Sequence, residues 1–141
     1  MKTVLVTGGT RGIGLSTALK FIEEGWNVYI TSRKQENLDA VLEDHSDLKG
    51  FVARADDLSA ATETCKTIVS DTGSLDALIN NAGTNPSGGS LLDVELSAVQ
   101  KTWDVNLMGP LMWTREAVKA GLKESVLNVC SVGGIKPAHY M

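Results

Sequence analysis

The glycine-rich segment from Thr7 to Gly14, TGGTRGIG, constrains the fold more than any other part of the sequence. It follows a short apolar run, Thr3 to Val6, and leads into an amphipathic segment, Ile13 to Glu24. Glycine in such a turn allows a positive φ and leaves no Cβ between the backbone and a ligand. The unpaired amides at a helix N-terminus suit a pyrophosphate. A strand, this turn and a helix in succession therefore predict a dinucleotide site, and an ordinary glycine-rich turn is the alternative.

Short apolar runs alternate with amphipathic segments along the rest of the chain. The further runs of strand length are Val28–Thr31, Gly50–Ala53, Leu75–Ile79 and Val126–Cys130. The expected helices are Ile13–Glu24, Gln35–His45, Ala60–Asp71 and a long stretch from about Val94 to Leu122. Runs with little apolar/polar alternation are typical of strands buried on both faces of a parallel sheet. We therefore predict one α/β domain over residues 1–141, a Rossmann-like doubly wound parallel sheet of five strands with flanking helices.

Several residues are expected to mark the ends of these helices. Gly25 and Gly73 follow two of them, where a left-handed residue commonly ends a helix. Ser59 and Asp93 precede two others, where a side-chain oxygen can accept from free amides. Residues Thr84 to Ser90, TNPSGGS, indicate a long flexible loop.

Composition excludes several classes of protein. Hydrophobic residues make up 43% of the chain and charged residues 21%, so a disordered or fibrous protein is a poor interpretation. Thirteen basic and seventeen acidic residues give a net charge of −4, which argues against a nucleic-acid partner. No apolar run approaches the length of a membrane span, and the start of the chain has too few apolar residues for a signal peptide. Cys65 and Cys130 lie far apart without metal-ligand spacing or a paired framework, so we expect no metal site. Taken together, these features predict a cytoplasmic protein.

The glycine spacing resembles that of the short-chain dehydrogenase/reductase family, in its compact T-G-x-x-x-G-x-G subtype. The extended subtype would require a glycine at Arg11 and fits less well. The resemblance runs from Thr3 to about Gly134. It implies hydride transfer between a nicotinamide cofactor and a small-molecule carbonyl or alcohol. It also implies that the turn binds the cofactor through Gly8, Thr10, Arg11, Gly12, Ile13 and Gly14.

The end of the second strand bears on which nicotinamide cofactor is used. NAD-dependent enzymes commonly carry an acidic residue there, which binds the ribose hydroxyl. Here the strand ends Thr31-Ser32-Arg33, and no carboxylate stands at that place. Arg33 and Arg11 would suit a 2′-phosphate, which favours NADP(H) over NAD(H) and adds Ser32 to the expected cofactor contacts. Alternatively, Arg33 is a solvated loop charge.

Two further segments at strand ends match the nucleotide-binding pattern of the family. The resemblance assigns Asp57 and Leu58, after the third strand, to the adenine. A helix-capping role for this segment is the other interpretation, and the two roles are compatible. The tetrapeptide N-N-A-G closes the fourth strand, where the resemblance implies that Asn80, Ala82 and Gly83 line the adenosine side and steady the sheet.

The catalytic residues implied by the resemblance are only partly present. Asn106 matches the helix Asn that kinks the helix and holds a water in the proton relay, although a surface Asn is the alternative. Ser131 matches the strand-end Ser that hydrogen-bonds the substrate oxygen, although Ser is also a common turn residue. Cys130 is expected to be a small buried side chain.

The family's Tyr-x-x-x-Lys pair does not occur in these residues. Tyr140 stands closer to Ser131 than the family's Tyr would, and no Lys follows it. We therefore expect the 141-residue chain to be inactive alone, with the later strands of the family fold missing.

Three hypotheses follow: the NADP-binding part of a carbonyl reductase or alcohol dehydrogenase, a non-catalytic NADP(H)-binding module, and a partner-dependent structural fragment. An unpaired edge at Val126–Cys130 predicts either a complementing C-terminal segment or self-association. The family resemblance also implies a homo-oligomer for the intact enzyme.

Overall fold

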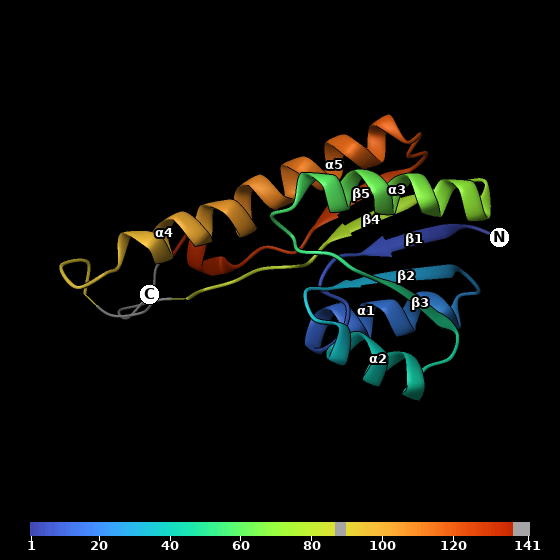
Figure 1. Ribbon diagram of the computed structural model, residues 1–141, viewed down its shortest axis with the longest axis horizontal. Helices are drawn as coiled ribbons and strands as arrows, with labels where there is room; N and C mark the ends of the chain where they lie inside the picture. The colour runs from blue at the N-terminus through green and yellow to red at the C-terminus, as the bar shows by residue number, and fades with distance from the viewer. Residues whose placement is uncertain (87–89, 137–141) are drawn as a thin grey trace.

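A parallel sheet of five strands forms the centre of the computed structural model, which describes residues 1–86 and 90–136 (Figure 1). The strands are β1 (Thr3–Val6), β2 (Asn27–Ser32), β3 (Leu48–Val52), β4 (Ala77–Asn80) and β5 (Ser125–Asn128). Their order across the sheet is β3-β2-β1-β4-β5. The order reverses direction between β1 and β4, the place where open α/β sheets bind ligands at their carboxyl edge. The expected doubly wound sheet is confirmed.

Helices cover both faces of the sheet (Figure 1). They are α1 (Gly12–Glu23), α2 (Gln35–Asp44), α3 (Leu58–Thr72), α4 (Leu96–Trp103) and α5 (Gly109–Lys119). A π-helical stretch, η1 (Asp104–Met108), joins α4 to α5, and a 3₁₀ turn, η2 (Val132–Gly134), follows β5. The long helix expected between Val94 and Leu122 is therefore one helical rod whose hydrogen-bond pattern changes in the middle. Figure 1 shows α1 and α2 on one face and α3 and α5 on the other.

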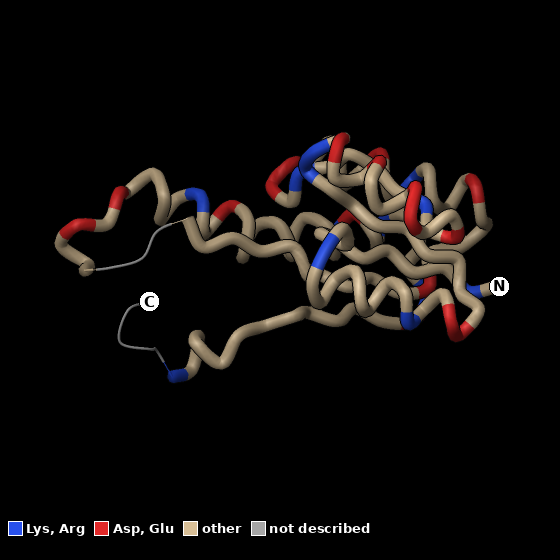
Figure 2. Tube along the Cα trace, turned by 90° about the horizontal axis from the view of Figure 1, so that it is seen from below, with Lys and Arg blue, Asp and Glu red and all other residues tan. Residues whose placement is uncertain are grey.

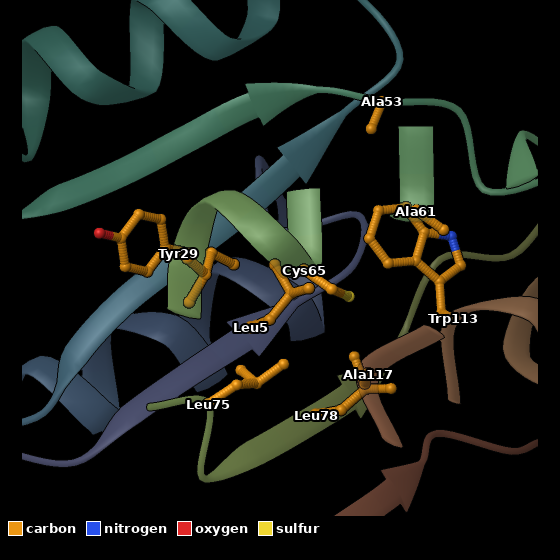
Figure 3. Close-up of a cluster of buried hydrophobic side chains, with 10 residues drawn as sticks. Leu5, Tyr29, Ala53, Ala61, Cys65, Leu75, Leu78, Trp113 and Ala117 are labelled. Atoms are coloured by element: carbon orange, nitrogen blue, oxygen red, sulfur yellow. The ribbon is translucent and has the colours of Figure 1, made fainter. Parts of the chain in front are cut away.

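The core has two layers because successive residues of each strand face opposite sides of the sheet. Leu5 and Leu78 pack with α3 and α5, including the buried Trp113 (Figure 3). Val4 and Val6 pack with residues of α1 and α2 on the other side. Burial on both faces explains why β1 is apolar throughout.

The edge strand differs from the prediction. β5 begins at Ser125 and ends at Asn128, and its Leu127 is 53% exposed. The apolar run had suggested a strand reaching Cys130, but that residue lies beyond the strand and is exposed, so the expectation of a buried Cys130 is wrong.

The helix ends are partly as expected. Gly25 and Gly73 both have φ of 78°, which confirms them as left-handed residues at helix ends. The prediction that Ser59 and Asp93 cap the next two helices is wrong. The Asp57 carboxylate instead accepts from the Ala60 amide at 3.1 Å, so α3 begins earlier and Ser59 lies inside its first turn. α4 begins after Glu95, whose side chain does not cap it.

Figure 2 shows acidic and basic residues interspersed over the outer helices. Within residues 1–86 and 90–136, no helix is both long and apolar enough to cross a bilayer. The same residues contain no cluster of His, Cys, Asp and Glu side chains that could hold a metal ion. The predicted loop from Thr84 to Ser90 lies partly outside the described residues.

Candidate functional site

The glycine-rich turn lies between β1 and α1, against the segment that follows β4. Gly8 has φ of 66° and Gly12 has φ of 54°, conformations that L side chains rarely adopt. A Cβ at Gly8 would meet the Ala82 Cα at 3.0 Å, and a Cβ at Gly14 would overlap the Gly8 oxygen. Glycine is therefore required both by the backbone conformation and by the close approach of two loops.

The N-terminus of α1 is open to a ligand. Its N-cap residue is Arg11, which is exposed and makes no capping hydrogen bond. A guanidinium carries only donors, so it cannot accept from the free amides of the first turn. A Cβ at Gly12 would meet no atom within 4 Å, and Ile13 is exposed. The first turn of α1 therefore presents amides and partial positive charge at the carboxyl edge of the sheet. Thr10 lies in the same turn and is partly buried.

Thr7 and Asn81 fasten the glycine-rich turn to the end of β4. The Thr7 hydroxyl accepts from the backbone amides of Asn81 and Ala82, each at 3.1 Å. The Asn81 amide group donates to the carbonyls of Thr7 at 3.1 Å and Gly8 at 3.0 Å. Neither residue was among the predicted site residues. Their signal was present, because Thr7 directly precedes the glycines and Asn81 is the second Asn of N-N-A-G.

The end of β2 supports the same turn. The Gly8 amide donates to the Thr31 hydroxyl at 3.1 Å. Ser32 is buried, and its hydroxyl donates to the Lys34 carbonyl at 3.0 Å. The Ser32 side chain therefore shapes the turn after β2. Arg33 is exposed, and neither Arg33 nor Arg11 takes part in the ion pairs found among the described residues.

Asp57 and Leu58 lie after β3 at the same edge of the sheet. Asp57 caps α3 with Oδ1, and a carboxylate has a second oxygen that a ligand can reach. Leu58 is 40% exposed. The capping role of this segment is thus confirmed, and a contact with adenine stays a prediction.

The Asn80 side chain points away from the glycine-rich turn. Its amide group donates to the Thr114 hydroxyl of α5 at 3.1 Å and to Asn128 Oδ1 of β5 at 2.9 Å. Asn80 Oδ1 is buried and has no partner among the described residues. Asn80 therefore steadies β5 against β4, while Ala82 lies against Gly8 of the turn and the exposed Gly83 lies near Asn106.

A cavity of about 950 Å³ opens beside the ends of β4 and β5. Asn80, Asn106, Pro110, Asn128 and Ser131 are among its lining residues. The cavity thus brings together both predicted catalytic residues, which lie in η1 and directly before η2. Cys130 also lines it.

The side chains of Asn106 and Ser131 are both held in place. Asn106 Nδ2 donates to the Thr84 carbonyl at 2.7 Å, and its Oδ1 accepts from the Thr84 amide at 2.8 Å. Asn106 is exposed, as the surface alternative expects, and both ends of its amide group bind the segment after N-N-A-G. Ser131 Oγ accepts from the Gly133 amide at 3.1 Å, which leaves its own hydrogen free to donate into the cavity.

Asp56 and Glu116, whose pKa values are both lowered, lie outside this cavity lining. The Arg54 guanidinium, and Lys101 beside it, lower the pKa of Asp56 to about 2. Hydrogen bonds from Arg115 and Lys119 lower the pKa of Glu116 to about 2. Both carboxylates therefore stay ionised at neutral pH. Burial raises the pKa of the Cys65 thiol to about 12, which leaves it unreactive in the core.

Comparison with known proteins places this site in a family. The family model described as short chain dehydrogenase matches residues 2–141. Tropinone reductase-like 3 of Erythroxylum coca is 31% identical over 96% of this chain and 55% of its own length. Dehydrogenase/reductase SDR family member 4 of Homo sapiens is 33% identical over 97% of this chain and 52% of its own.

Solved structures give the same result. ElxO with NADP bound has a TM-score of 0.90 at 29% identity, over 97% of this chain and 58% of that chain. An actinorhodin polyketide ketoreductase with NADPH has a TM-score of 0.92 at 27% identity, over 98% of this chain and 56% of that one. The chain thus spans about half the length of the curated relatives it matches, 55% and 52% for the two above. With its glycine-rich turn, its sheet order and these matches, the chain belongs to the short-chain dehydrogenase family of oxidoreductases.

Proposed function

We propose that this chain forms the NADP(H)-binding part of a short-chain carbonyl reductase or alcohol dehydrogenase acting on a small molecule. The observation that carries the proposal is the cradle at Gly8 and Gly14, where a Cβ would strike the neighbouring loop. These contacts hold the turn closely against the end of β4, whereas a Cβ at Gly12 would enter open space, so the first turn of α1 has room for a pyrophosphate beside its free amides. When bound, the nicotinamide supplies or accepts the hydride.

The charges around the cradle support NADP(H) over NAD(H). Arg11 and Arg33 are exposed at the carboxyl ends of β1 and β2, and no acidic residue closes β2. A guanidinium binds phosphate through paired, charge-assisted hydrogen bonds. Arg11 and Arg33 would thus hold the 2′-phosphate, and the Asp57 carboxylate would accept from the adenine amine. The NADP and NADPH named with the two solved structures are consistent with this choice.

The cavity beside β5 supplies the proton-transfer side of the reaction. Ser131 would donate its free hydrogen to the substrate oxygen, and Asn106 would fix the cavity wall through Thr84. The 141 residues contain no Tyr-x-x-x-Lys pair, which the family resemblance assigns to proton transfer. We therefore expect this chain alone to bind NADPH without reducing ketones at a measurable rate.

Titration of the 141-residue chain with NADPH, followed by cofactor fluorescence, tests the proposal. The unmodified chain should bind, and Gly14→Ala should abolish binding because its methyl group enters the space of the Gly8 carbonyl and Asn81. Ala40→Val, at an exposed position of α2, is the control and should bind normally. Absence of binding by the unmodified chain would exclude both the enzyme part and the non-catalytic module. Ketone turnover by the pure chain would contradict the expected inactivity.

The exposed edge supports a partner for this chain. Leu127 of β5 and Trp103 of α4 are more than half exposed, and Asn128 and Val129 at the end of β5 line the cavity. Such a surface suits either a complementing segment with the later part of the family fold or a second copy of the chain. Light scattering after size exclusion separates the two. A second copy of the chain would give a dimer or larger species, whereas a chain that awaits a complementing segment would be a monomer.

A further inference from the structure

The β3–α3 loop (Arg54–Asp57) is held from outside by two helices that lie far along the chain. It begins after β3, where the Ala53 amide donates to the Ser32 carbonyl at 2.8 Å. Within the loop, the Asp57 amide donates to the Arg54 carbonyl at 3.2 Å and closes a turn. The loop ends at Asp57 and Leu58, the residues that the proposed function assigns to adenine.

One anchor is the backbone at Ala55. The indole Nε1 of Trp113, a fully buried residue of α5, donates to the Ala55 carbonyl at 3.1 Å. A Cβ at Gly109, where α5 begins, would stand 2.9 Å from the same oxygen. The loop therefore packs directly on the start of α5. Figure 3 shows the Trp113 ring beside Ala61 of α3, the helix that the loop leads into.

The other anchor is the side chain of Asp56, which is only 15% exposed. Arg54 donates to both of its oxygens, at 3.1 and 3.0 Å, from within the loop. Lys101 of α4 reaches the same carboxylate with its Nζ at 2.5 Å. Lys101 is thus the residue that ties the loop to α4, whereas Arg54 belongs to the loop itself.

We propose that Lys101 and Trp113 are positioning residues for the adenine end of the cofactor. Neither side chain needs to touch the cofactor in this role. Together they hold both the backbone and the partly buried Asp56 carboxylate of the β3–α3 loop, so that Asp57 and Leu58 are presented to adenine in a fixed position. The inference rests on the proposed cofactor function.

Binding of 2′,5′-ADP and of NADPH by the 141-residue chain tests this role. Lys101→Met should weaken both ligands by about threefold to tenfold, the range for a partly buried ion pair, because both contain the adenosine end. Lys101→Arg, which keeps the charge, should restore binding. Asp56→Asn should resemble Lys101→Met, and the double variant should lose little more than either single variant. Trp113→Phe keeps an aromatic side chain of smaller size, removes the N–H donor to the Ala55 carbonyl and should act in the same direction.

The matched control is Lys119→Met. Lys119 also lies on a helix and pairs with a buried carboxylate, Glu116, at 3.0 Å, but it has no contact with the loop. It should leave the affinity for 2′,5′-ADP unchanged. Hydrogen exchange at the Asp57 amide gives a readout that needs no ligand, and exchange should be faster in Lys101→Met than in Lys119→Met.

The outcomes separate this inference from the proposed function. Wild-type affinity in Lys101→Met, an equal loss in Lys119→Met, or no recovery in Lys101→Arg would overturn the positioning role while cofactor binding stood. If the unmodified chain bound neither ligand, the proposed function would fall. Hydrogen exchange at the Asp57 amide would then test whether Lys101 anchors the loop. An exchange rate in Lys101→Met equal to that of the unmodified chain would refute the anchoring.

Discussion

The two sides of the carboxyl edge of the sheet are built very differently. Around β1 and β4, Thr7 and Asn81 form a dense set of hydrogen bonds between the glycine-rich turn and the N-N-A-G segment. Around β5, Leu127 is largely exposed, and the Ser131 hydroxyl accepts a hydrogen bond from within its own turn, at Gly133. The side around β1 and β4 is thus held together by contacts within this chain, whereas the side around β5 is exposed.

This difference separates the two tasks of the proposed enzyme. A dinucleotide cradle needs fixed backbone amides and the absence of Cβ atoms, and these are set by β1, β2 and β4 alone. Proton transfer needs several side chains arranged around a substrate, and of the catalytic residues that the family resemblance implies, the described part of the chain brings Asn106 and Ser131 to that cavity. We therefore expect the preorganised side to bind its ligand without further residues.

A matched pair of leucines should show the largest contrast between the two sides. Leu78 of β4 is fully buried, while Leu127 of β5 is not. Leu78→Ala should lower the free energy of unfolding by about 2–5 kcal/mol, because it leaves a cavity in the core. Leu127→Ala should cost less than about 1 kcal/mol. Urea unfolding followed by circular dichroism measures both, and equal costs would show that β5 is covered in solution.

Asn81→Leu should break the link between the turn and β4. It removes two donors and leaves the carbonyls of Thr7 and Gly8 without these partners. We expect a loss of about 1–3 kcal/mol in the free energy of unfolding, together with weaker NADPH binding. Asn37→Leu, at an exposed position of α2, is the control. If both variants bound NADPH equally well, the link would not be needed for the cradle.

Arg33→Asp should change the cofactor preference without changing the fold. A carboxylate there would repel the 2′-phosphate and could bind the ribose hydroxyls, so the ratio of NADPH to NADH affinity should fall by about tenfold or more. Lys66→Asp makes the same charge change at an exposed position of α3 and should leave the ratio unchanged. A parallel fall in both variants would mean that only the net charge matters.

The smallest expected effect is the acid dependence of the loop after β3. The folded pKa of Asp56 is lowered to about 2 by Arg54 and Lys101, below its usual value of 3.8. Its contribution to stability is therefore present above about pH 4 and is lost as pH falls toward 2. Asp56→Asn should flatten this part of the stability curve, measured by urea unfolding between pH 2 and pH 5. An unchanged slope would show that the pair contributes nothing measurable.

Local patterns predicted the strands and helices well, and they failed where long-range contacts decide. Gly25 and Gly73 were predictable because a left-handed helix end depends on neighbouring residues only. The start of α3 was misplaced because Asp57 and Ser59, two residues apart, are both residue types that cap helices, and the local pattern does not show which of them precedes the first turn. Cys130 was expected to be buried because the apolar run continues to it, whereas β5 ends at Asn128 and leaves Cys130 exposed beyond the strand.

The sequence by itself determined the parallel sheet and the position of the dinucleotide cradle, because burial periodicity and glycine conformations are local properties. It also indicated Asn106 and Ser131, although it could not show that they share one cavity. Only the tertiary structure decided that Asn80 faces β5, that Asn81 fastens the turn and that Lys101 holds Asp56. These contacts join residues far apart in the chain, and they exist only because the order of the strands brings those residues to the same edge of the sheet.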